Sequence, residues 1–433
     1  MAIAASVVLV IAALVAVQFL VLPALWAPRT EPDPYQDECR RAGPSQLSRT
    51  THSPSGTVRV IRLTDDGEFA DRCELTDVLY DIRNRKESEL VVWYIHGWKH
   101  NADDDDPDLM EFTNLIKALD EQERKGGHST RHVVGVYVGW DGAVGPAVLR
   151  NLTFWNRKRA ADRISQSAVV TRIFASAKYA RMQAGEKATS RDLTIMIGHS
   201  FGARILYTAT SQVLIDEVQR RHPGNKEGSY GVIKGPADLI VLLNPAFEAS
   251  IFTAMHGIRR PAPKEWERIH RDQRPLLLAI ATENDRATGR MFPLGQSVEF
   301  ARTSRQRETL GNHGAYVTHE LKAVSPSDGP STSRFWFDSF EAAGLVLQRK
   351  EGVRHPGNPF IVARTTPDVI DGHNGIWGKD LRNWVIAFLR RLQDPAFVPS
   401  ETERRSSEQV RPAPESGGTL DYGRRADTDG VVL

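Results

Sequence analysis

The stretch from Leu193 to Gly202 constrains the fold of this chain more than any other. It begins with LTIMI, a short run rich in branched apolar side chains, which predicts a strand buried on both faces. The next five residues read GHSFG, with Gly198 and Gly202 two positions on either side of Ser200. A serine in a strained turn needs neighbours without a Cβ, because its hydroxyl must stand clear of the backbone. Residues 203–219 then predict a helix.

The remaining chain alternates strands with helices. Short apolar runs predict further strands at residues 57–63, 90–95, 132–139, 238–244, 275–282 and 360–363. Helices are predicted between and after them, chiefly at residues 74–85, 109–119, 155–184 and 379–392. This alternation predicts an α/β protein with a doubly wound, mostly parallel sheet and helices on both faces. A length of 433 residues allows one such large domain with appendages.

The GHSFG turn, between its strand and its helix, resembles the nucleophile turn of the α/β-hydrolase superfamily, with a lipase- or esterase-like character. The similarity extends over residues 57–393, roughly the whole predicted domain. It implies an α/β-hydrolase fold in which Ser200 is the nucleophile, followed along the chain by a carboxylate and then a histidine. The resemblance implies neither a metal ion nor an organic cofactor, and we expect none.

Three carboxylates are candidates for the acid that orients the histidine. The resemblance places this acid in the loop after the strand at residues 275–282, where Glu283 and Asp285 follow. Asp285 lies two residues further from the strand and matches the pattern of the family better than Glu283. Glu248, after the strand at residues 238–244, is a more distant candidate. We therefore expect Asp285 to be the acid and the other two to be solvated charges.

The general base must be one of 13 histidines. His373 lies in a glycine-flanked loop, DGHNG, between the last predicted strand and the last predicted helix, where the resemblance places the base. His319 is the next candidate. His313 lies in the same irregular segment as His319, and His355 comes just before the last strand. His199, within GHSFG, is held in the turn and should face away from the serine, so it is a poor base.

A serine hydrolase also needs two N–H donors for the oxyanion that forms during acyl transfer. The resemblance assigns one of them to the backbone of Phe201, the residue after the nucleophile. The second is expected after the strand at residues 90–95, where His96-Gly97-Trp98 is similar to the short H-G-x motif of the superfamily. Gly97 permits a close approach of the backbone, and the N–H of Trp98 would be the donor. The alternative for the same residues is an ordinary tight turn at a strand end.

Residues 2–27 contain no charged side chain. As a helix they would extend roughly 39 Å at about 1.5 Å per residue, more than the ~30 Å hydrocarbon core of a bilayer. No basic residue precedes them and they exceed the apolar core of a signal peptide, so we expect a single retained membrane anchor. Arg29, Arg40 and Arg41 follow the segment and favour a cytoplasmic main domain. An enzyme body behind an N-terminal anchor is more usually translocated, so both orientations stay open.

The segments outside the predicted strands and helices are polar. Residues 29–56 predict a linker, and residues 394–433, rich in Pro, Glu, Ser and Gly, predict a disordered tail. Residues 294–358 interrupt the alternation and predict an insertion, either a lid over the site or a surface loop. The two cysteines, Cys39 and Cys73, could form one disulfide in an oxidising compartment and would remain thiols in a reducing one.

Charge and composition narrow the classes of function. The formal net charge is +2 and the basic residues are not clustered, so nucleic-acid binding has no electrostatic support. Four consecutive aspartates, residues 103–106, lack the alternating spacing of a calcium loop and predict a solvated acidic loop.

These residues lead us to expect a membrane-anchored serine esterase that acts on a small-molecule or lipid-like ester through an acyl-enzyme. The same triad serves amidases, thioesterases and acyltransferases, which remain alternatives. Outside the enzymes, the alternative is a non-catalytic, membrane-tethered interaction module with a hydrolase-like fold. The sequence contains no signal for the oligomeric state.

Overall fold

The computed structural model describes most of the predicted domain. The described residues are 51–52, 57–84, 88–125, 131–143, 153–183, 192–221, 232–259, 273–293, 303–324, 339–353 and 358–393. The predicted membrane anchor at residues 2–27, most of the linker at residues 29–56 and the tail at residues 394–433 lie outside them. Within the described residues, no helix combines the length and the apolar character needed to cross a bilayer.

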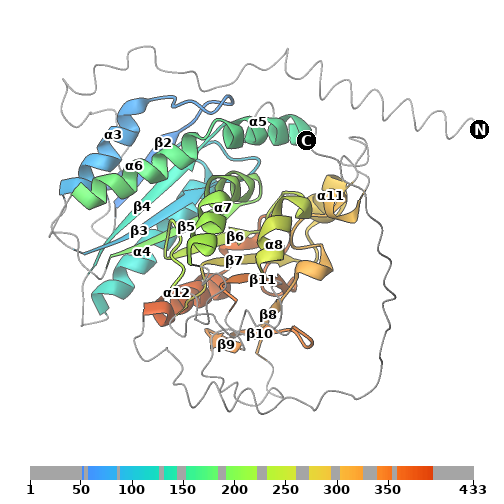
Figure 1. The fold of residues 1–433 in the computed structure, drawn as a ribbon. Coiled ribbons are helices and arrows are strands. Elements are labelled where there is room, and N and C mark those ends of the chain that lie inside the picture. Colours follow the sequence, from blue (N-terminus) through green and yellow to red (C-terminus); the bar gives the residue numbers. More distant parts are fainter. Residues whose placement is uncertain are drawn as a thin grey trace, which may run out of the picture.

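Eleven strands of the described residues form one sheet in the order β1-β2-β4-β3-β5-β6-β7-β11-β8-β10-β9. All of them except β1 are labelled in Figure 1. Their bounds are β1 Thr51–His52, β2 Thr57–Arg62, β3 Glu89–Ile95, β4 His132–Gly139, β5 Leu193–His199, β6 Leu239–Leu243, β7 Leu277–Thr282, β8 His319–Ala323, β9 Ser339–Ala342, β10 Leu345–Arg349 and β11 Phe360–Thr365. From β2 to β8 every neighbouring pair is parallel. Only the outermost pairs, with β1 at one end and with β10 and β9 at the other, are antiparallel. The sheet is therefore mostly parallel, as the sequence predicted.

The central strands are continuous apolar runs because both of their faces are covered. β3, β6 and β7 are buried at every position, which is typical of parallel strands between two layers of helices. Toward the antiparallel end, β8 and β9 contain exposed or half-buried positions as well as buried ones. Positions open to solvent can carry polar residues, so the sequences of these two strands are more polar.

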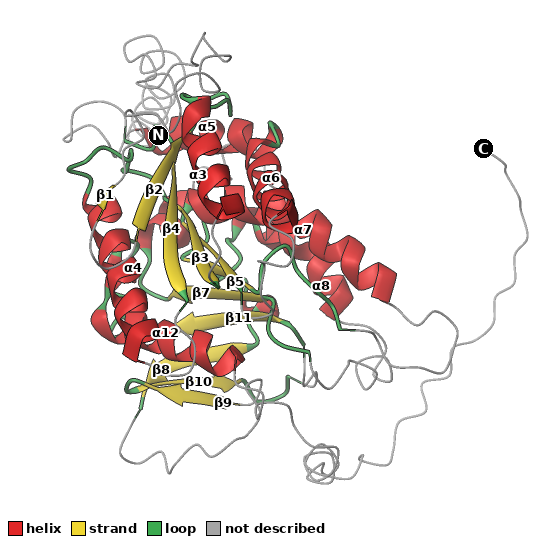
Figure 2. Cartoon of the chain, turned by 90° about the vertical axis from the view of Figure 1, so that its left-hand side faces the viewer, coloured by secondary structure: helices red, strands yellow, loops and turns green. Residues whose placement is uncertain are grey.

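Helices cover both faces of the sheet (Figure 2). α4 and α12 pack on one face, and α3, α5, α6 and α7 pack on the other, each layer with its own cluster of buried apolar side chains. The helix bounds are α3 Arg72–Asn84, α4 Pro107–Lys125, α5 Phe154–Gln166, α6 Val169–Gln183, α7 Phe201–Arg221, α8 Thr253–Arg259, α11 Ser304–Arg307 and α12 Lys379–Gln393. Short 3₁₀ or π turns are η5 Ala249–Phe252, η6 Ala287–Met291, η7 Gly314–Tyr316 and η8 Gly375–Trp377.

The spacing of apolar residues explains how α12 packs. Leu381, Trp384 and Phe388 recur at intervals of three and four residues, and all three are buried against the sheet. Arg390 and Arg391 lie in the last turn, where positive charge interacts favourably with the carboxyl end of a helix.

Much of the described part of the predicted insertion at residues 294–358 belongs to the sheet, which the expectation of a lid or a surface loop did not include. It contains β8, β9 and β10, which extend the sheet beyond β11. Some of the polar residues that broke the expected alternation occupy exposed or half-buried positions of these strands, whereas β10 begins with three buried apolar residues. The predicted linker also contains a short element, because Thr51–His52 pairs with β2.

Two smaller expectations are also answered by the structure. Asp106, expected in a solvated loop, is buried: its Oδ1 accepts the N–H of Asp108 at 2.8 Å and lies 2.9 Å from Nδ1 of His100. Asp106 therefore caps the amino end of α4 and is not a solvated charge.

Cys73 is disulfide-bonded, and Cys39, the other cysteine of the chain, lies outside the described residues.

The sheet topology determines where the candidate site lies. In a parallel sheet the loops that follow the strands all leave from the same edge. The loops after β3, β5, β7 and β11 carry Gly97, Ser200, Asp285 and His373 respectively. Because β5, β6, β7 and β11 are consecutive neighbours in the sheet, the last three of these loops meet at one edge.

Candidate active site

Ser200 occupies the turn between β5 and α7. Its φ is +57°, in the left-handed region that residues other than glycine seldom adopt. Its N–H donates to the carbonyl of Leu243 in β6 at 3.0 Å, and its carbonyl accepts the N–H of Ala246 at 3.1 Å. The strained turn is thus held by the neighbouring strand and by the loop that follows it.

The glycines around Ser200 allow backbone segments to pack closely. A Cβ on Gly202 would lie 2.1 Å from the carbonyl oxygen of Ile95, and a Cβ on Gly198 would lie 2.7 Å from Cα of Ala203. The first turn of α7 therefore lies directly against the end of β3. The N–H groups of Ala203 and Arg204 donate to the carbonyl of Ser200 at 3.1 and 3.3 Å, whereas the very first N–H groups of a helix have no acceptor within it.

Ser200, His373 and Asp285 lie in one row of hydrogen bonds. The hydroxyl of Ser200 donates to Nε2 of His373 over 2.6 Å, although 173 residues separate them. Nδ1 of the same imidazole donates to Oδ2 of Asp285 over 2.7 Å. The three side chains that the sequence singled out as nucleophile, base and acid are thus in contact, in the order that the resemblance implied.

Asp285 is held as an anion. Its side chain is 1% exposed, and its Oδ1 accepts the N–H groups of Ala287 at 2.9 Å and Thr288 at 3.1 Å. Burial by itself raises the pKa of the Asp285 carboxyl. The electrostatic interaction with His373 and the hydrogen bonds from His373 and Thr288 outweigh burial, so the pKa of Asp285 lies below its ordinary value. A carboxylate of this kind can stabilise a positive charge on the imidazole.

The loop after β3 passes against the serine. A Cβ on Gly97 would lie 2.6 Å from Cβ of Ser200, so only glycine fits this approach. Trp98 follows, 3% exposed, and its indole N–H donates to Oγ1 of Thr153 at 3.2 Å. The N–H of Lys99 donates to the carbonyl of Gly142 at 2.9 Å, which joins this loop to the loop after β4.

Trp98 and Phe201, the expected oxyanion donors, share one packing partner. The ring of Phe154, at the start of α5, lies 5.0 Å from the ring of Trp98 and 5.1 Å from that of Phe201, measured between centroids. All three rings are buried. The two backbone segments on either side of Ser200 are therefore parts of one packed unit.

Sequence reasoning missed the pair that holds this loop, His96 and Trp140. Two hydrogen bonds join the pair: Nε2 of His96 accepts the backbone N–H of Trp140 at 2.9 Å, and the indole N–H of Trp140 donates to the backbone carbonyl of His96 at 2.9 Å. The other ring nitrogen of His96, Nδ1, donates to the carbonyl of Gly97 at 2.8 Å. Burial lowers the pKa of His96, which suits a neutral ring that donates once and accepts once. The sequence could have indicated this pair, because Trp140-Asp141-Gly142 directly follows β4 and therefore lies in another loop at the same edge of the sheet.

The structure assigns the alternative candidates elsewhere. Glu283 is exposed, and Glu248 pairs with Arg204 and, at 3.1 Å, with Nζ of Lys158. Among the other histidines, His319 lies in β8, with its Nδ1 2.9 Å from Oγ1 of Thr318. Nδ1 of His313 lies 2.7 Å from the carboxylate of Glu308. His355 is not among the described residues. His199 is buried, and its Nε2 donates to the backbone carbonyl of His373 at 2.9 Å rather than to the serine.

The row is largely closed to solvent in this structure. Ser200 has no exposed surface, and the side chain of His373 is 12% exposed. His373 is the most exposed of the three side chains.

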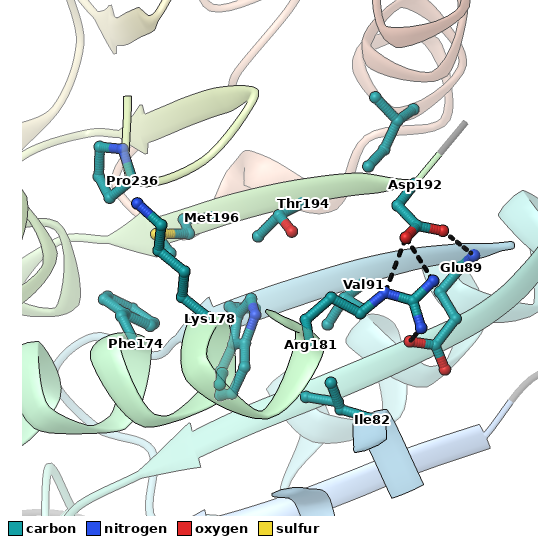
Figure 3. Close-up of a pocket in the computed structure, with 13 residues that line it drawn as sticks. Ile82, Glu89, Val91, Phe174, Lys178, Arg181, Asp192, Thr194, Met196 and Pro236 are labelled. Atoms are coloured by element: carbon teal, nitrogen blue, oxygen red, sulfur yellow. Dashed lines mark hydrogen bonds and ion pairs between the residues drawn. The ribbon is translucent and has the colours of Figure 1, made fainter. Parts of the chain in front are cut away.

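Two pockets lie at the opposite edge of the sheet. One, of about 270 Å³, is enclosed by α6 and the first residues of β3 and β5, Glu89 and Leu193 (Figure 3). Its walls are mainly apolar, and an ion pair between Arg181 and Asp192 closes one end. A second, of about 380 Å³, adjoins the start of β5 and the end of α12. Both are at the amino ends of the strands, so neither belongs to the site around Ser200.

Comparison with known proteins does not assign this chain to a family. No family model matches the chain, and no curated protein matches it. One solved structure that it matches is phospholipase PlaB from Legionella pneumophila in complex with thio-NAD, at 12% identity and a TM-score of 0.26. The match covers 74% of this chain and spans 61% of that chain. A TM-score of this size does not establish a common fold.

Proposed function

We propose that this chain is a serine hydrolase of the α/β-hydrolase superfamily that cleaves carboxylic esters. The observation that carries the proposal is the row of hydrogen bonds from Ser200 through His373 to Asp285, over 2.6 and 2.7 Å. A hydroxyl, an imidazole and a carboxylate in this order are what nucleophilic catalysis by serine requires. The row lies at the carboxyl edge of a parallel sheet, where α/β proteins usually bind ligands.

In the first half of the reaction, Oγ of Ser200 attacks the ester carbonyl carbon while its proton passes to Nε2 of His373. Before the attack, the neutral imidazole carries its single proton on Nδ1, where the hydrogen bond to Asp285 holds it, so Nε2 is free to accept the proton of Ser200. The depressed pKa of Asp285 keeps the carboxylate charged beside the imidazolium. When the tetrahedral intermediate collapses, the alcohol takes the proton from Nε2 and the acyl group stays on Ser200.

The second half repeats these steps with water. His373 takes a proton from a water molecule that attacks the acyl carbon, and the second intermediate expels Oγ of Ser200. The proton returns to Oγ, and the carboxylic acid leaves. In both halves, the backbone N–H groups of Phe201 and Trp98 would stabilise the oxyanion, and one such donor is commonly worth about 3–4 kcal/mol in the transition state.

The substrate class is inferred from the predicted anchor. The 26 uncharged residues at positions 2–27 support attachment of the domain to a membrane by a single helix. A domain held at a bilayer meets lipid-like and other hydrophobic esters most often, and we propose these as substrates. The chemistry of the row would also cleave thioesters or amides or transfer an acyl group.

The test is covalent labelling of the full chain in detergent with a fluorophosphonate probe. We expect labelling at Ser200, together with hydrolysis of simple aryl esters, and loss of both in Ser200→Ala while thermal unfolding is unchanged. Ser304→Ala, which alters an exposed serine of α11, is the matched control and should behave as wild type. Equal labelling or turnover in Ser200→Ala would reject the assignment.

One observation favours a second candidate, a non-catalytic interaction module with a hydrolase-like fold. Ser200 has no exposed surface, as expected if the row serves only to hold the loops together. The probe separates the two functions. A folded wild-type chain that stays unlabelled, both in detergent and in lipid vesicles, would favour the module, whereas labelling at Ser200 favours the hydrolase.

A further inference from the structure

The loop that carries His373 has little stiffness of its own. Gly372, with φ of +68°, precedes His373, and Gly375 follows two residues later. Glycine has more backbone freedom than other residues, so the loop alone would leave the imidazole loosely placed. A contact of 2.6 Å between Nε2 of His373 and Oγ of Ser200 therefore depends on support from outside the loop.

That support converges on one atom, the backbone carbonyl oxygen of His373. Nε2 of His199 donates to it at 2.9 Å, and Nδ2 of Asn244 donates to it at 2.8 Å. A carbonyl oxygen has two lone pairs, so the two bonds use its accepting capacity completely. His199 is the last residue of β5 and Asn244 directly follows β6, so both donors stand on the central strands of the sheet.

The Asn244 side chain is itself locked in one orientation. Asn244 is fully buried with φ of +43°, a left-handed conformation that asparagine tolerates better than most residues. Its Oδ1 accepts the N–H of Thr282 at 3.0 Å, while Nδ2 also lies 3.2 Å from the carbonyl of Gly372. A flipped amide would set an oxygen against two carbonyls and a nitrogen against an N–H, so the network determines the orientation.

His199 is restricted in the same way. It is 1% exposed, and burial together with the nearby His373 lowers its pKa well below the ordinary value, so the ring carries one proton. The carbonyl of His373 places that proton on Nε2. Nδ1 has no hydrogen-bond partner among the described residues and lies close to Gly97, where an added Cβ would be 2.9 Å away. A proton there would be buried without an acceptor, which is unfavourable.

We propose that Asn244 and His199 form a clamp on the backbone carbonyl of His373 and are positioning residues for ester hydrolysis at Ser200. The inference rests on the proposed function above and deepens it. The clamp holds the backbone and leaves both ring nitrogens free for Ser200 and Asp285. It therefore keeps the imidazole between its two partners in every protonation state of the reaction.

Loss of one donor from the clamp should slow the reaction. With one hydrogen bond fewer on the carbonyl, the glycine-flanked loop samples a wider range of distances between Nε2 of His373 and Oγ of Ser200. Misplacement of a reacting group by about 1 Å can cost about 100-fold in rate. We therefore expect kcat to fall by about 10- to 100-fold with KM little changed, since the clamp touches no substrate.

The experiment compares Asn244→Gly, which keeps the left-handed backbone and removes the amide, with the wild-type full chain in detergent. We expect slower fluorophosphonate labelling at Ser200, a lower kcat for an aryl ester and loss or broadening of the low-field proton resonance from the hydrogen bond between His373 and Asp285. His199→Leu should act in the same direction, and His199→Gln, which can still donate from its amide, should restore part of the rate. If the variants at one of the two positions fail to fold, those at the other position still test the clamp.

Asn84→Gly is the matched control. Asn84 caps the carboxyl end of α3, where its Nδ2 donates to the carbonyl of Tyr80 on the exposed surface. It should leave the labelling rate, kcat and the low-field resonance unchanged. Asn244→Asp adds a pH readout: a carboxylate beside His373 should shift the acidic limb of kcat/KM to higher pH, which loss of stability alone would not do.

The outcomes separate the clamp from the proposed function. Folded Asn244→Gly and His199→Leu chains with wild-type labelling rates and an unchanged low-field resonance would overturn the clamp and leave the hydrolase proposal standing. A wild-type chain that is never labelled at Ser200 would overturn the hydrolase proposal. In that case the low-field resonance still decides whether the two donors hold the imidazole against Asp285.

Discussion

The carboxylate of Asp285 lies 2.7 Å from Nδ1 of His373, and its other oxygen accepts two backbone N–H groups. Two hydrogen-bond donors on one side fix the carboxylate, so its remaining oxygen can fix the imidazole. Asp285 thus connects the backbone of the loop after β7 to the imidazole of His373.

Asp285→Asn should therefore retain the shape of the site and lose most of its activity. An amide in this position favours the wrong imidazole tautomer and provides no charge for the imidazolium, and in serine hydrolases such a change costs about 10⁴ in kcat. We expect a loss of about 10³–10⁴ in kcat for an aryl ester. Glu283→Gln, which neutralises the exposed carboxylate two residues earlier, is the control and should stay close to wild type. Equal losses in the two variants would contradict the role of Asp285.

Gly97→Ala should impair the reaction with little change in folding elsewhere. The added Cβ would lie 2.6 Å from Cβ of Ser200, so the loop with Trp98 must retreat and carry its N–H away from the oxyanion. We expect kcat to fall by about 10²–10³, the cost of one lost oxyanion donor. Gly257→Ala, whose Cβ would meet nothing within 4 Å, is the matched control. An active Gly97→Ala chain would exclude this loop from oxyanion binding.

Glu248 should make stability depend on pH. Burial raises its pKa, but Arg204 and Lys158 outweigh burial and lower it from 4.5 to about 2. A carboxyl with a lowered folded-state pKa stabilises the fold above its unfolded-state value of 4.5, and this contribution disappears as the pH falls to about 2. The shift corresponds to about 3 kcal/mol at most.

Urea unfolding of Glu248→Gln and of wild type at a series of pH values measures this contribution. The difference in free energy of unfolding between the two chains should be largest above pH 4.5 and should shrink toward pH 2. Asp216→Asn is the control, because solvent screens its exposed ion pair with Arg220 on α7 and the difference in free energy of unfolding should stay small at every pH. A difference that stays constant over the whole range would show that Glu248 does not titrate as the structure indicates.

Removal of residues 1–28 should release the protein from membranes. The full chain should remain in the pellet after alkaline extraction, because ~20 apolar residues already suffice to span a bilayer as a helix. The shortened chain should appear in the supernatant and keep its fluorophosphonate labelling. A full chain that is extracted by alkali would contradict a membrane-spanning anchor.

Much of the fold was predictable because local patterns encode it. The apolar runs at β3, β5, β6 and β7 are buried on both faces, and only a covered parallel sheet accommodates such runs. β8 and β9 were missed because polar residues occupy their exposed positions, so their sequences resemble those of loops. β10 was missed although its first three residues are apolar and buried, because so short a run does not stand out in a polar segment.

The candidate site was predictable in part. The resemblance pointed to His373, which contacts Ser200, and to Asp285, which contacts His373. It gave no hint that Asn244 and His199 converge on one carbonyl oxygen, because an asparagine after a strand and a histidine inside a turn have no pattern of their own. Only the positions of the neighbouring loops make these residues partners.

The sequence by itself determined the strand, the glycine-flanked turn and the helix around Ser200, since these depend on residues close together in the chain. The tertiary structure decided which of the histidines and carboxylates meet that serine. Ser200 and His373 are 173 residues apart, and they touch because β5, β6, β7 and β11 are consecutive in the sheet. Strand order arises from long-range pairing and from the packing of two helical layers, and no local run of residues encodes either.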